Sequence, residues 1–294
     1  MSSFEIESYK PADRGDYIAL LGKAWGHAGM SGEHFDWWFD GDPTGSLRSV
    51  ARIDGRIVAV AGHKLIRMVL RGEERLTTFS CHATTLPEAS GRGIFQALQR
   101  HLEDGAQACG AEIVLGFSSA PTTPIFLHRL GWSEVGQFRL WVRPVLRHGE
   151  ELLATSLGPE GDAAAAWPGN HIVRDSRHLA WRYLQSPHGY VALRSGGGYA
   201  VVWPAKTQGG RTVSLLVDLA GPPDEIPALL GRAARVSRTR LLFALPAPEQ
   251  HGVFLRAGFV PTSRRMPLLG RGLAGPLDTN QDSWRFTLGD MDFF

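Results

Sequence analysis

The chain has 294 residues, of which 43% are apolar, and it carries a formal net charge of only +2. A chain of this size forms one large domain or two ordinary ones, with enough apolar residues for a core. Because the net charge is small, it creates no strong field, and we expect neither nucleic acid nor a membrane as a partner.

The first part of the chain alternates between strand and helix patterns. Its middle strands are separated by turns, of which Asp54-Gly55 is a strong hairpin signal. A glycine-rich stretch then passes into a helix with Ile94, Leu98 and Leu102 on one face, which Gly110 ends. The predicted order is a strand at 4–9, helices at 12–25 and 31–43, a hairpin at 49–70, a strand at 75–86, a helix at 94–109, a strand at 111–118, a helix at 121–131 and a strand at 133–145.

The second part repeats the first. From about residue 147 to 169 the composition shifts to Gly, Ala, Glu and Pro, which is typical of a linker. Beyond it, HFDWWFDGDPTG from His34 reappears as HLAWRYLQSPHG from His178, and FLHRLGW from Phe126 reappears as VFLRAGF from Val253. We therefore interpret the chain as a duplication with domains 1–147 and 148–294. Each is predicted as an α+β unit with a mixed, mostly antiparallel sheet flanked by helices.

The two copies differ at one loop. The first has PEASGRGIF between a strand and a helix, whereas the second has AGPPDEIPALL, without the Gly-x-Gly pattern. A helix start offers backbone N–H groups and a partial positive charge to phosphate, and glycine lets a ligand approach the backbone. Neither a P-loop nor a Rossmann fingerprint is present. The pattern therefore favours a phosphate-bearing ligand in the first copy alone.

This order of elements resembles the GNAT superfamily of acyl-CoA-dependent N-acyltransferases. The resemblance covers most of the first half and rests on GRGI at the helix start and on FLHRLGW near the end of that half. The family signature, Arg/Gln-x-x-Gly-x-Gly/Ala, aligns with residues 90–95, where Gly93 matches the first glycine. Ser90 stands where Arg or Gln is usual, and Phe95 stands where Gly or Ala is usual. The second half resembles a GNAT copy that lacks the pyrophosphate loop.

The resemblance implies a site for acetyl-CoA or another acyl-CoA between two splayed parallel strands. The amides of residues 91–95 would hold the pyrophosphate, and the backbone of residues 84–86 would pair with the pantetheine. An N–H near Leu86 would hold the thioester carbonyl, as in an oxyanion hole. The residues assigned to the acyl-CoA are Thr84, Thr85, Leu86, Ser90, Gly91, Arg92, Gly93, Ile94, Phe95 and Ser119.

His82 is the candidate general base, since several GNAT enzymes carry their base on this strand. By the two-residue period of a strand, side chains 82, 84 and 86 are expected to share one face. By the same period Cys81 points to the opposite face, so no Cys–His nucleophile is expected. The alternative reading of His82, a packed core histidine, stays open. Leu127 occupies the position at which the family usually has a Tyr that acts as the general acid, so this general acid is absent.

The acceptor side is less defined. His34 and Asp36 lie on the second helix, which often walls the acceptor site in the family. Trp37 recurs as Trp181, so packing explains it better than ligand binding. The C-terminal tail carries Asp290 and Asp292, and we expect it to return to the acceptor side, where carboxylates would suit a cationic amine. The alternative is a frayed, solvated end.

The cysteines and the termini bear on location and on metals. Two cysteines, Cys81 and Cys109, argue against a disulfide framework and fit a reducing compartment. No metal-ligand spacing occurs among His and Cys. The N-terminus has no apolar signal core, no apolar run reaches the length of a membrane span, and nearly all basic residues are Arg. We expect a cytoplasmic bacterial protein, as a monomer or homodimer.

The function predicted from these features is the transfer of an acetyl group from acetyl-CoA to the amine of a small molecule. Three alternatives stay open. They are an aminoacyl-tRNA-dependent peptidyltransferase, a GNAT-like acyl-CoA decarboxylase and a non-catalytic acyl-CoA sensor.

Overall fold

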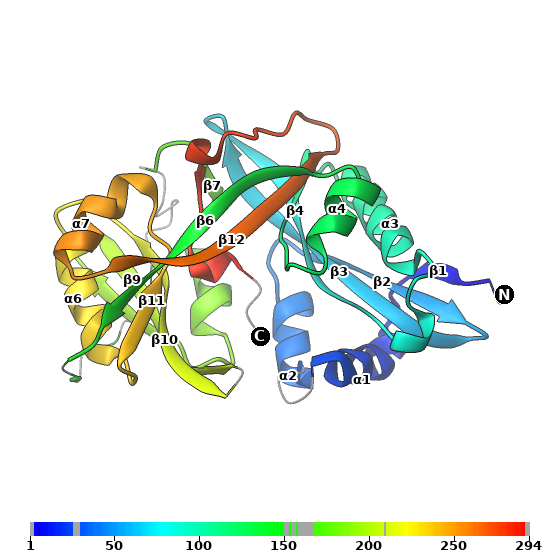
Figure 1. The fold of residues 1–294 in the computed structure, drawn as a ribbon, viewed down its shortest axis with the longest axis horizontal. Coiled ribbons are helices and arrows are strands. Elements are labelled where there is room, and N and C mark those ends of the chain that lie inside the picture. Colours follow the sequence, from blue (N-terminus) through cyan, green and yellow to red (C-terminus); the bar gives the residue numbers. More distant parts are fainter. Residues whose placement is uncertain are drawn as a thin grey trace.

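Strands from both halves of the chain form one sheet with helices against it (Figure 1). The fold confirms the predicted α+β class. Among the described residues, no helix is long and apolar enough to cross a membrane. The structure is a computed structural model that describes residues 3–25, 30–146, 148, 149, 153, 157, 167–208 and 210–291.

The order of elements matches the predicted duplication. In the first half the elements are β1 (Glu5–Ser8), α1 (Arg14–Trp25), α2 (Gly32–Phe35), η3 (Asp36–Asp40), β2 (Ser46–Ile53), β3 (Arg56–Leu70), β4 (Glu73–Thr85), η4 (Pro87–Ala89), α3 (Ile94–Ala108), β5 (Ile113–Phe117), α4 (Thr123–Arg129) and β6 (Ser133–Pro144). In the second half they are β7 (Asn170–Ile172), α5 (Ser176–Leu179), η5 (Ala180–Leu184), β8 (Val191–Ser195), β9 (Gly198–Gln208), β10 (Arg211–Ala220), α6 (Ile226–Val236), β11 (Leu241–Ala244), α7 (His251–Arg256), β12 (Val260–Gly272), β13 (Trp284–Arg285) and η8 (Leu288–Asp290).

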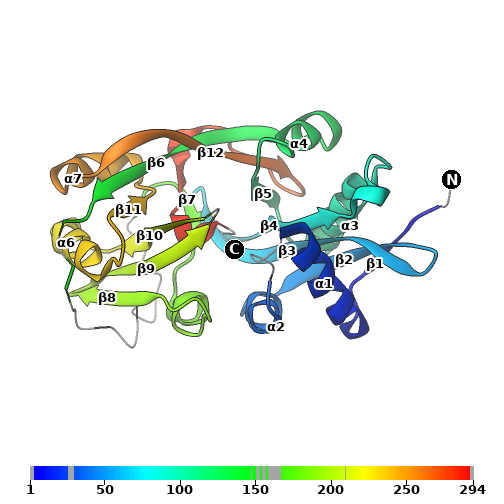
Figure 2. The same cartoon turned by 60° about the horizontal axis from the view of Figure 1, so that its bottom comes forward.

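The two halves exchange their last long strands. The sheet runs in the order β1-β2-β3-β4-β5-β12-β6-β11-β10-β9-β8. Strand β12 of the second half therefore lies beside β5, and β6 of the first half pairs with β11. Figures 1 and 2 show β6 and β12 running side by side across both lobes. Sequence analysis did not predict this exchange, and the domain boundary proposed near residue 147 stays a prediction.

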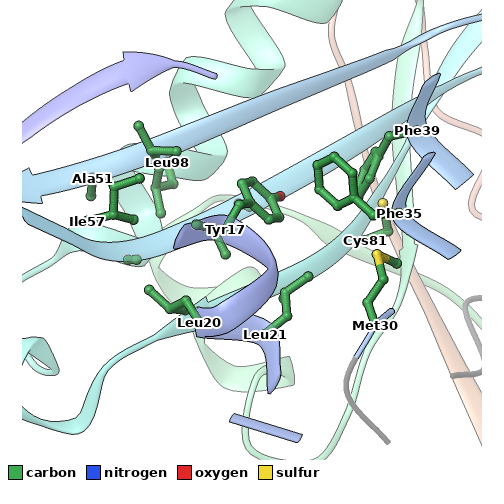
Figure 3. Packing of buried hydrophobic residues seen from close by; sticks show 14 of the residues in the cluster. Tyr17, Leu20, Leu21, Met30, Phe35, Phe39, Ala51, Ile57, Cys81 and Leu98 are labelled. Atoms are coloured by element: carbon green, nitrogen blue, oxygen red, sulfur yellow. The ribbon is translucent and has the colours of Figure 1, made fainter. Parts of the chain in front are cut away.

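The core of the first half packs helices α1 and α2 against the sheet (Figure 3). Tyr17 on α1 lies with its ring centroid 5.4 Å from that of Phe35 and 6.1 Å from that of Phe39. Gly62 on β3 makes this packing possible, because a Cβ there would lie 2.7 Å from the Phe39 ring. This core fixes the helix that carries Trp37 and Trp38 over the end of β4.

The predicted repeat forms a reciprocal contact between the halves. Trp37 Nε1 donates a hydrogen bond to the carbonyl of Trp181 at 2.8 Å, and Trp181 Nε1 donates to the carbonyl of Trp37 at 2.9 Å. The two indoles are stacked, with centroids 5.8 Å apart. Both tryptophans are buried and satisfied, which confirms the interpretation of Trp37 as a packing residue.

Buried histidines make the stability of the fold depend on pH. Burial lowers the pKa of His63 to about 4, and burial together with the charges of Arg174 and Arg182 lowers that of His178 to about 3. An unfolded histidine titrates near 6.5, so between these values the unfolded chain binds more protons. We expect these histidines to leave the free energy of unfolding at its full value above pH 6.5, and we expect that free energy to decrease as the pH falls toward 4. Each histidine contributes a slope of up to about 1.4 kcal/mol per pH unit.

Urea unfolding at about pH 7, 6 and 5 checks this expectation. The substitution His63→Gln should make the dependence of the unfolding free energy on pH shallower, whatever it does to the stability at pH 7. The exposed His128 offers a control, and His128→Gln should keep the wild-type slope. A wild-type unfolding free energy that stays flat from pH 6.5 to 5 would show that these histidines are charged in the folded protein.

Candidate active site

A cavity of about 350 Å³ opens where β4 and β5 separate. The two parallel strands are paired only at Thr78↔Val114 and Phe79↔Leu115, so they diverge beyond these residues. Residues 80–83 line the cavity from one strand and residues 116–119 from the other. The predicted gap between two splayed parallel strands is therefore confirmed.

Both halves of the chain contribute to the wall of the cavity. The last described residues of the C-terminal tail line it, and Figures 1 and 2 show the end of the coloured ribbon between the two lobes. Residues of α5 and η5 also line the cavity, so the second half supplies part of its wall. The residues contributed by the second half include His178, Trp181, Arg182, Gly289, Asp290 and Met291.

His82 lies on a β-bulge at the edge of this cavity. Cys81 pairs with Gly62 and Thr84 with Val60, so β4 has two residues where β3 has one. His82 adopts a left-handed conformation with φ +47° and is 3% exposed. A left-handed non-glycine residue is strained, and such strain collects at functional sites. The bulge therefore holds His82 in an orientation that a regular strand would not give.

The bulge overturns one sequence inference that used the two-residue period. Cys81 and Thr84 face neighbouring same-face residues Gly62 and Val60 of β3, so β4 carries one extra residue between them. The alternation of side chains is therefore shifted by one after His82, and the expectation that residues 82, 84 and 86 share one face is wrong. Of these three residues, only His82 lines the cavity.

Aromatic rings hold His82 in place. Its ring makes edge-on contacts with Trp38 and Phe39, with centroids 5.6 and 5.8 Å apart. Both aromatic residues belong to η3, the π-helical turn that follows α2. The second helix of the chain therefore fixes the imidazole at the cavity wall.

A buried ion pair lines the cavity next to this histidine. Lys64 Nζ contacts the Asp42 carboxylate and donates to the carbonyl of Trp38, and both charged side chains are only 3% exposed. The ammonium also lies 4.8 Å from the ring centroid of Trp38 and 4.4 Å from that of Trp181. Burial lowers the pKa of Lys64, and the Asp42 carboxylate opposes this effect. Sequence analysis missed this pair.

The predicted pyrophosphate loop has the conformation that its glycines allow. Gly91 has φ +78° and Gly93 has φ +80°, so both positions favour glycine. A Cβ at Gly91 would meet no atom within 4 Å, so the space above the loop is open. Gly93 caps α3, whose first N–H groups have no acceptor inside the helix. Residues Ser90, Gly91 and Arg92 are exposed, whereas the side chain of Ile94 is buried in the core.

Leu86 cannot supply the N–H predicted for the thioester carbonyl. Its N–H donates to the carbonyl of Val58 at 2.8 Å, within the ladder to β3. Backbone groups of successive strand residues point to opposite sides. The N–H of Thr85 therefore points away from β3, toward the side where β5 diverges, while Thr84 pairs with Val60. The backbone N–H near Leu86 that faces this gap is therefore that of Thr85.

Two further predicted residues lie at the cavity. Phe95 lines it and packs edge-on against Phe126, with centroids 5.5 Å apart. Ser119 also lines it, and its N–H donates to Thr122 Oγ1 at 3.1 Å at the start of α4. Leu127, at the family's Tyr position, packs partly buried beside Phe126. Ser119 thus both organises the turn before α4 and faces the cavity.

His34 and Asp36 do not line this cavity. Asp36 is exposed and forms an ion pair with Arg14 at 2.8 Å. His34 stacks against His188 of the second half, with ring centroids 4.4 Å apart, and burial lowers its pKa. Their predicted acceptor role has no support from this geometry.

Asp290 lies at the cavity, but its carboxylate is already bound. Both oxygens accept from Arg174 Nη2 at 2.7 Å, and one also accepts from the N–H of Thr287. Arg174 is fully buried and also contacts Asp218 at 3.1 Å. The tail carboxylate therefore anchors the tail rather than facing an amine. Asp292 lies outside the described residues.

We expect Arg174→Met to destabilise the fold strongly. The change leaves the carboxylates of Asp218 and Asp290 buried without their cation, and breaking a buried ion pair typically costs about 3–5 kcal/mol. Chemical unfolding of the variant and of the exposed control Arg177→Met measures the difference. A loss below about 1 kcal/mol would contradict the anchoring role, because that is the range of an exposed pair.

Arg182 and His178 are the other cavity residues that sequence reasoning missed. Arg182 had a visible signal, because it aligns with the apolar Trp38 when the repeat is offset by 144 residues. A charge at a position that is buried in the other copy is unusual. His178 aligns with His34 in the same way but lies at the cavity.

Among the described residues, no group of three or more His, Cys, Asp or Glu side chains could hold a metal ion. The candidate site consists of His82 on its bulge, the glycine loop of residues 91–95, the diverging strands β4 and β5, and the residues of the second half that line the cavity.

Comparison with protein families identifies the first half. The family model described as an acetyltransferase (GNAT) domain matches residues 5–135. The match agrees with the sequence resemblance to the GNAT superfamily over residues 5–135. A search among curated proteins finds no match.

Solved structures show the same fold over nearly the whole chain. A GCN5-related N-acetyltransferase from Kribbella flavida is 14% identical, with a TM-score of 0.65, over 93% of this chain and 72% of that one. Eis1 from Mycobacterium abscessus is 16% identical, with a TM-score of 0.61, over 92% and 74%. N-myristoyltransferase from Saccharomyces cerevisiae with bound myristoyl-CoA is 11% identical, with a TM-score of 0.59, over 92% and 83%. At these identities the likeness concerns the fold.

Proposed function

We propose that the protein transfers an acyl group, with acetyl as the first candidate, from acyl-CoA to the amine of a small molecule. The observation that carries this proposal is the cavity between the diverging β4 and β5, beside a glycine loop that caps a long helix. A GNAT domain with these parts favours a thioester-bound acyl donor. The acceptor then comes from the side walled by the second half.

The chain offers suitable groups for each part of the donor. The N–H groups at the start of α3 and in the loop of residues 91–95 suit a pyrophosphate. The free backbone edge of Thr85 suits the pantetheine, because β5 has already diverged there. An acyl-CoA would supply a carbonyl activated by a thioester, with CoA thiolate as the leaving group.

Deprotonation of the amine is assigned to His82. An amine reaches the site largely as ammonium, and it must lose a proton before it can attack. His82 is the histidine on the acyl-binding strand, and its bulged backbone directs it to the cavity. We assign no general acid, because Leu127 stands at the family's Tyr position. The thiolate is a fair leaving group and can depart unprotonated.

Release of free thiol from acetyl-CoA over a panel of small amines tests the proposal. The products should gain the mass of one acetyl group, and no thiol should appear without an amine. The alternatives give different results. A decarboxylase would act on malonyl-CoA without an amine, a peptidyltransferase would need aminoacyl-tRNA, and a sensor would bind acetyl-CoA without turnover. Thiol release that does not depend on the amine would contradict the proposal.

A further inference from the structure

Arg182 is a buried guanidinium with unused hydrogen-bond donors. It is 5% exposed and lines the cavity from η5. Its Nε donates to the carbonyl of Gly289 at 3.0 Å, and its Nη1 donates to Tyr190 Oη at 3.3 Å. No described residue accepts a hydrogen bond from its Nη2. An arginine has five N–H donors, so most of them are left for a ligand.

In the described part of the chain, the neighbouring charged groups form no ion pair with Arg182. Among the described residues, no carboxylate lies within ion-pair distance of it. Burial lowers the pKa of Arg182, whereas Tyr190, Tyr183 and Asp290 raise it, with a net upward shift. Both oxygens of Asp290, however, accept from Arg174. Lys64 is matched by Asp42. Arg174 is the useful contrast, because its Nε, Nη1 and Nη2 all donate to protein oxygens.

Aromatic rings surround the guanidinium of Arg182 at the cavity. Its guanidinium carbon lies 5.4 Å from the Trp37 ring centroid and 5.2 Å from that of Trp38. These rings hold the planar group in one orientation. His82 contacts the same Trp38 ring from β4, at 5.6 Å between centroids. The proposed base and the guanidinium therefore share one aromatic neighbour and line the same cavity.

We propose that Arg182 binds a carboxylate on the acceptor, so that the substrate class is amines that also carry a carboxylate, such as amino acids. A fixed guanidinium suits a carboxylate because it offers parallel N–H donors to two oxygens. The carboxylate belongs to the acceptor, because Arg182 comes from the second half and the acyl donor enters from the strands of the first. This inference rests on the proposed function.

Binding tests the inference without turnover. The probes are N-acetylglycine, N-acetyl-L-alanine and N-acetyl-β-alanine, each paired with its carboxamide, titrated calorimetrically into the protein with CoA present. We expect at least one acid to bind about tenfold more tightly than its amide, because hydrogen bonds to a charged acceptor are the stronger ones. Equal affinity in every pair, or no binding of any acid, would overturn the inference.

Variants separate the role of Arg182 from a role in folding. Arg182→Met should abolish the preference for the acid over the amide, Arg182→Lys should keep part of it, and the exposed control Arg177→Met should keep all of it. The readout is the ratio of two affinities, so a general loss of stability does not imitate it. A preference that survives in Arg182→Met would overturn the assignment.

Turnover distinguishes the two sources of a carboxylate and separates this inference from the proposed function. Thiol release is measured with glycine, L-alanine and β-alanine against their amides, and with succinyl-CoA against butyryl-CoA. A preference for the amino acids supports the inference, whereas an Arg182-dependent preference for succinyl-CoA overturns it by placing the carboxylate on the donor. If acids bind through Arg182 but no amine releases thiol, the proposed function fails while the carboxylate site stands.

Discussion

His82→Asn should lower kcat with acetyl-CoA by roughly a hundredfold or more, the usual contribution of a positioned base. Asparagine tolerates the left-handed backbone of this position, so the bulge can persist without the imidazole. The Kd for CoA should stay unchanged, because His82 faces the cavity and not the glycine loop.

The exposed His128→Asn provides the control for His82. It should keep the wild-type kcat. A His82→Asn enzyme with near-normal kcat would show that the base lies elsewhere. His82 would then be a core histidine held between Trp38 and Phe39.

Gly93→Glu should abolish CoA binding to the protein. The change places a carboxylate at the helix cap where the pyrophosphate is expected, so two like charges would share one site. It also strains a backbone at φ +80°, and strain alone could weaken the loop. Gly93→Ala carries the strain without the charge, and we expect it to bind more weakly than wild type but measurably. Calorimetric titration with CoA compares the three proteins.

Gly110→Glu is the matched control for the new charge. Gly110 follows the opposite end of α3 with φ +92°, and a Cβ there meets no atom within 4 Å. It therefore receives the same strain and the same carboxylate at the far end of the same helix. CoA binding should be retained in this variant. Equal loss in Gly93→Glu and Gly110→Glu would mean that the helix, rather than its first turn, had been damaged.

Local patterns in the sequence predicted the elements but not their partners. The alternation and the turn residues of the first half predict β2 to β5 and α3, and the repeat of His34 and His178 predicts the second set. The exchange of β6 and β12 leaves no local signal, because any strand of this length can pair with either neighbour. Strand partners follow from the packing of the whole chain, which local periodicity does not contain.

The candidate site divides in the same way. The glycine loop is visible in the sequence because its conformation requires particular residues, and the splayed strands followed from the family resemblance. The bulge at His82 is not visible, since it depends on the register between β3 and β4. Asp290 and Arg182 show a second feature that the sequence does not reveal, which is the partner of a charged residue. A charged residue in the sequence does not reveal whether its partner will be the protein or a ligand.

Amide hydrogen exchange with and without acetyl-CoA most directly tests the location of the acyl-CoA site. We predict protection in peptides that cover residues 84–98 and 116–123, which lie at the proposed donor site, and none in peptides that cover residues 218–231 of the second half. Protection confined to the second half, or equal protection in both loops, would contradict a single acyl-CoA site between β4 and β5.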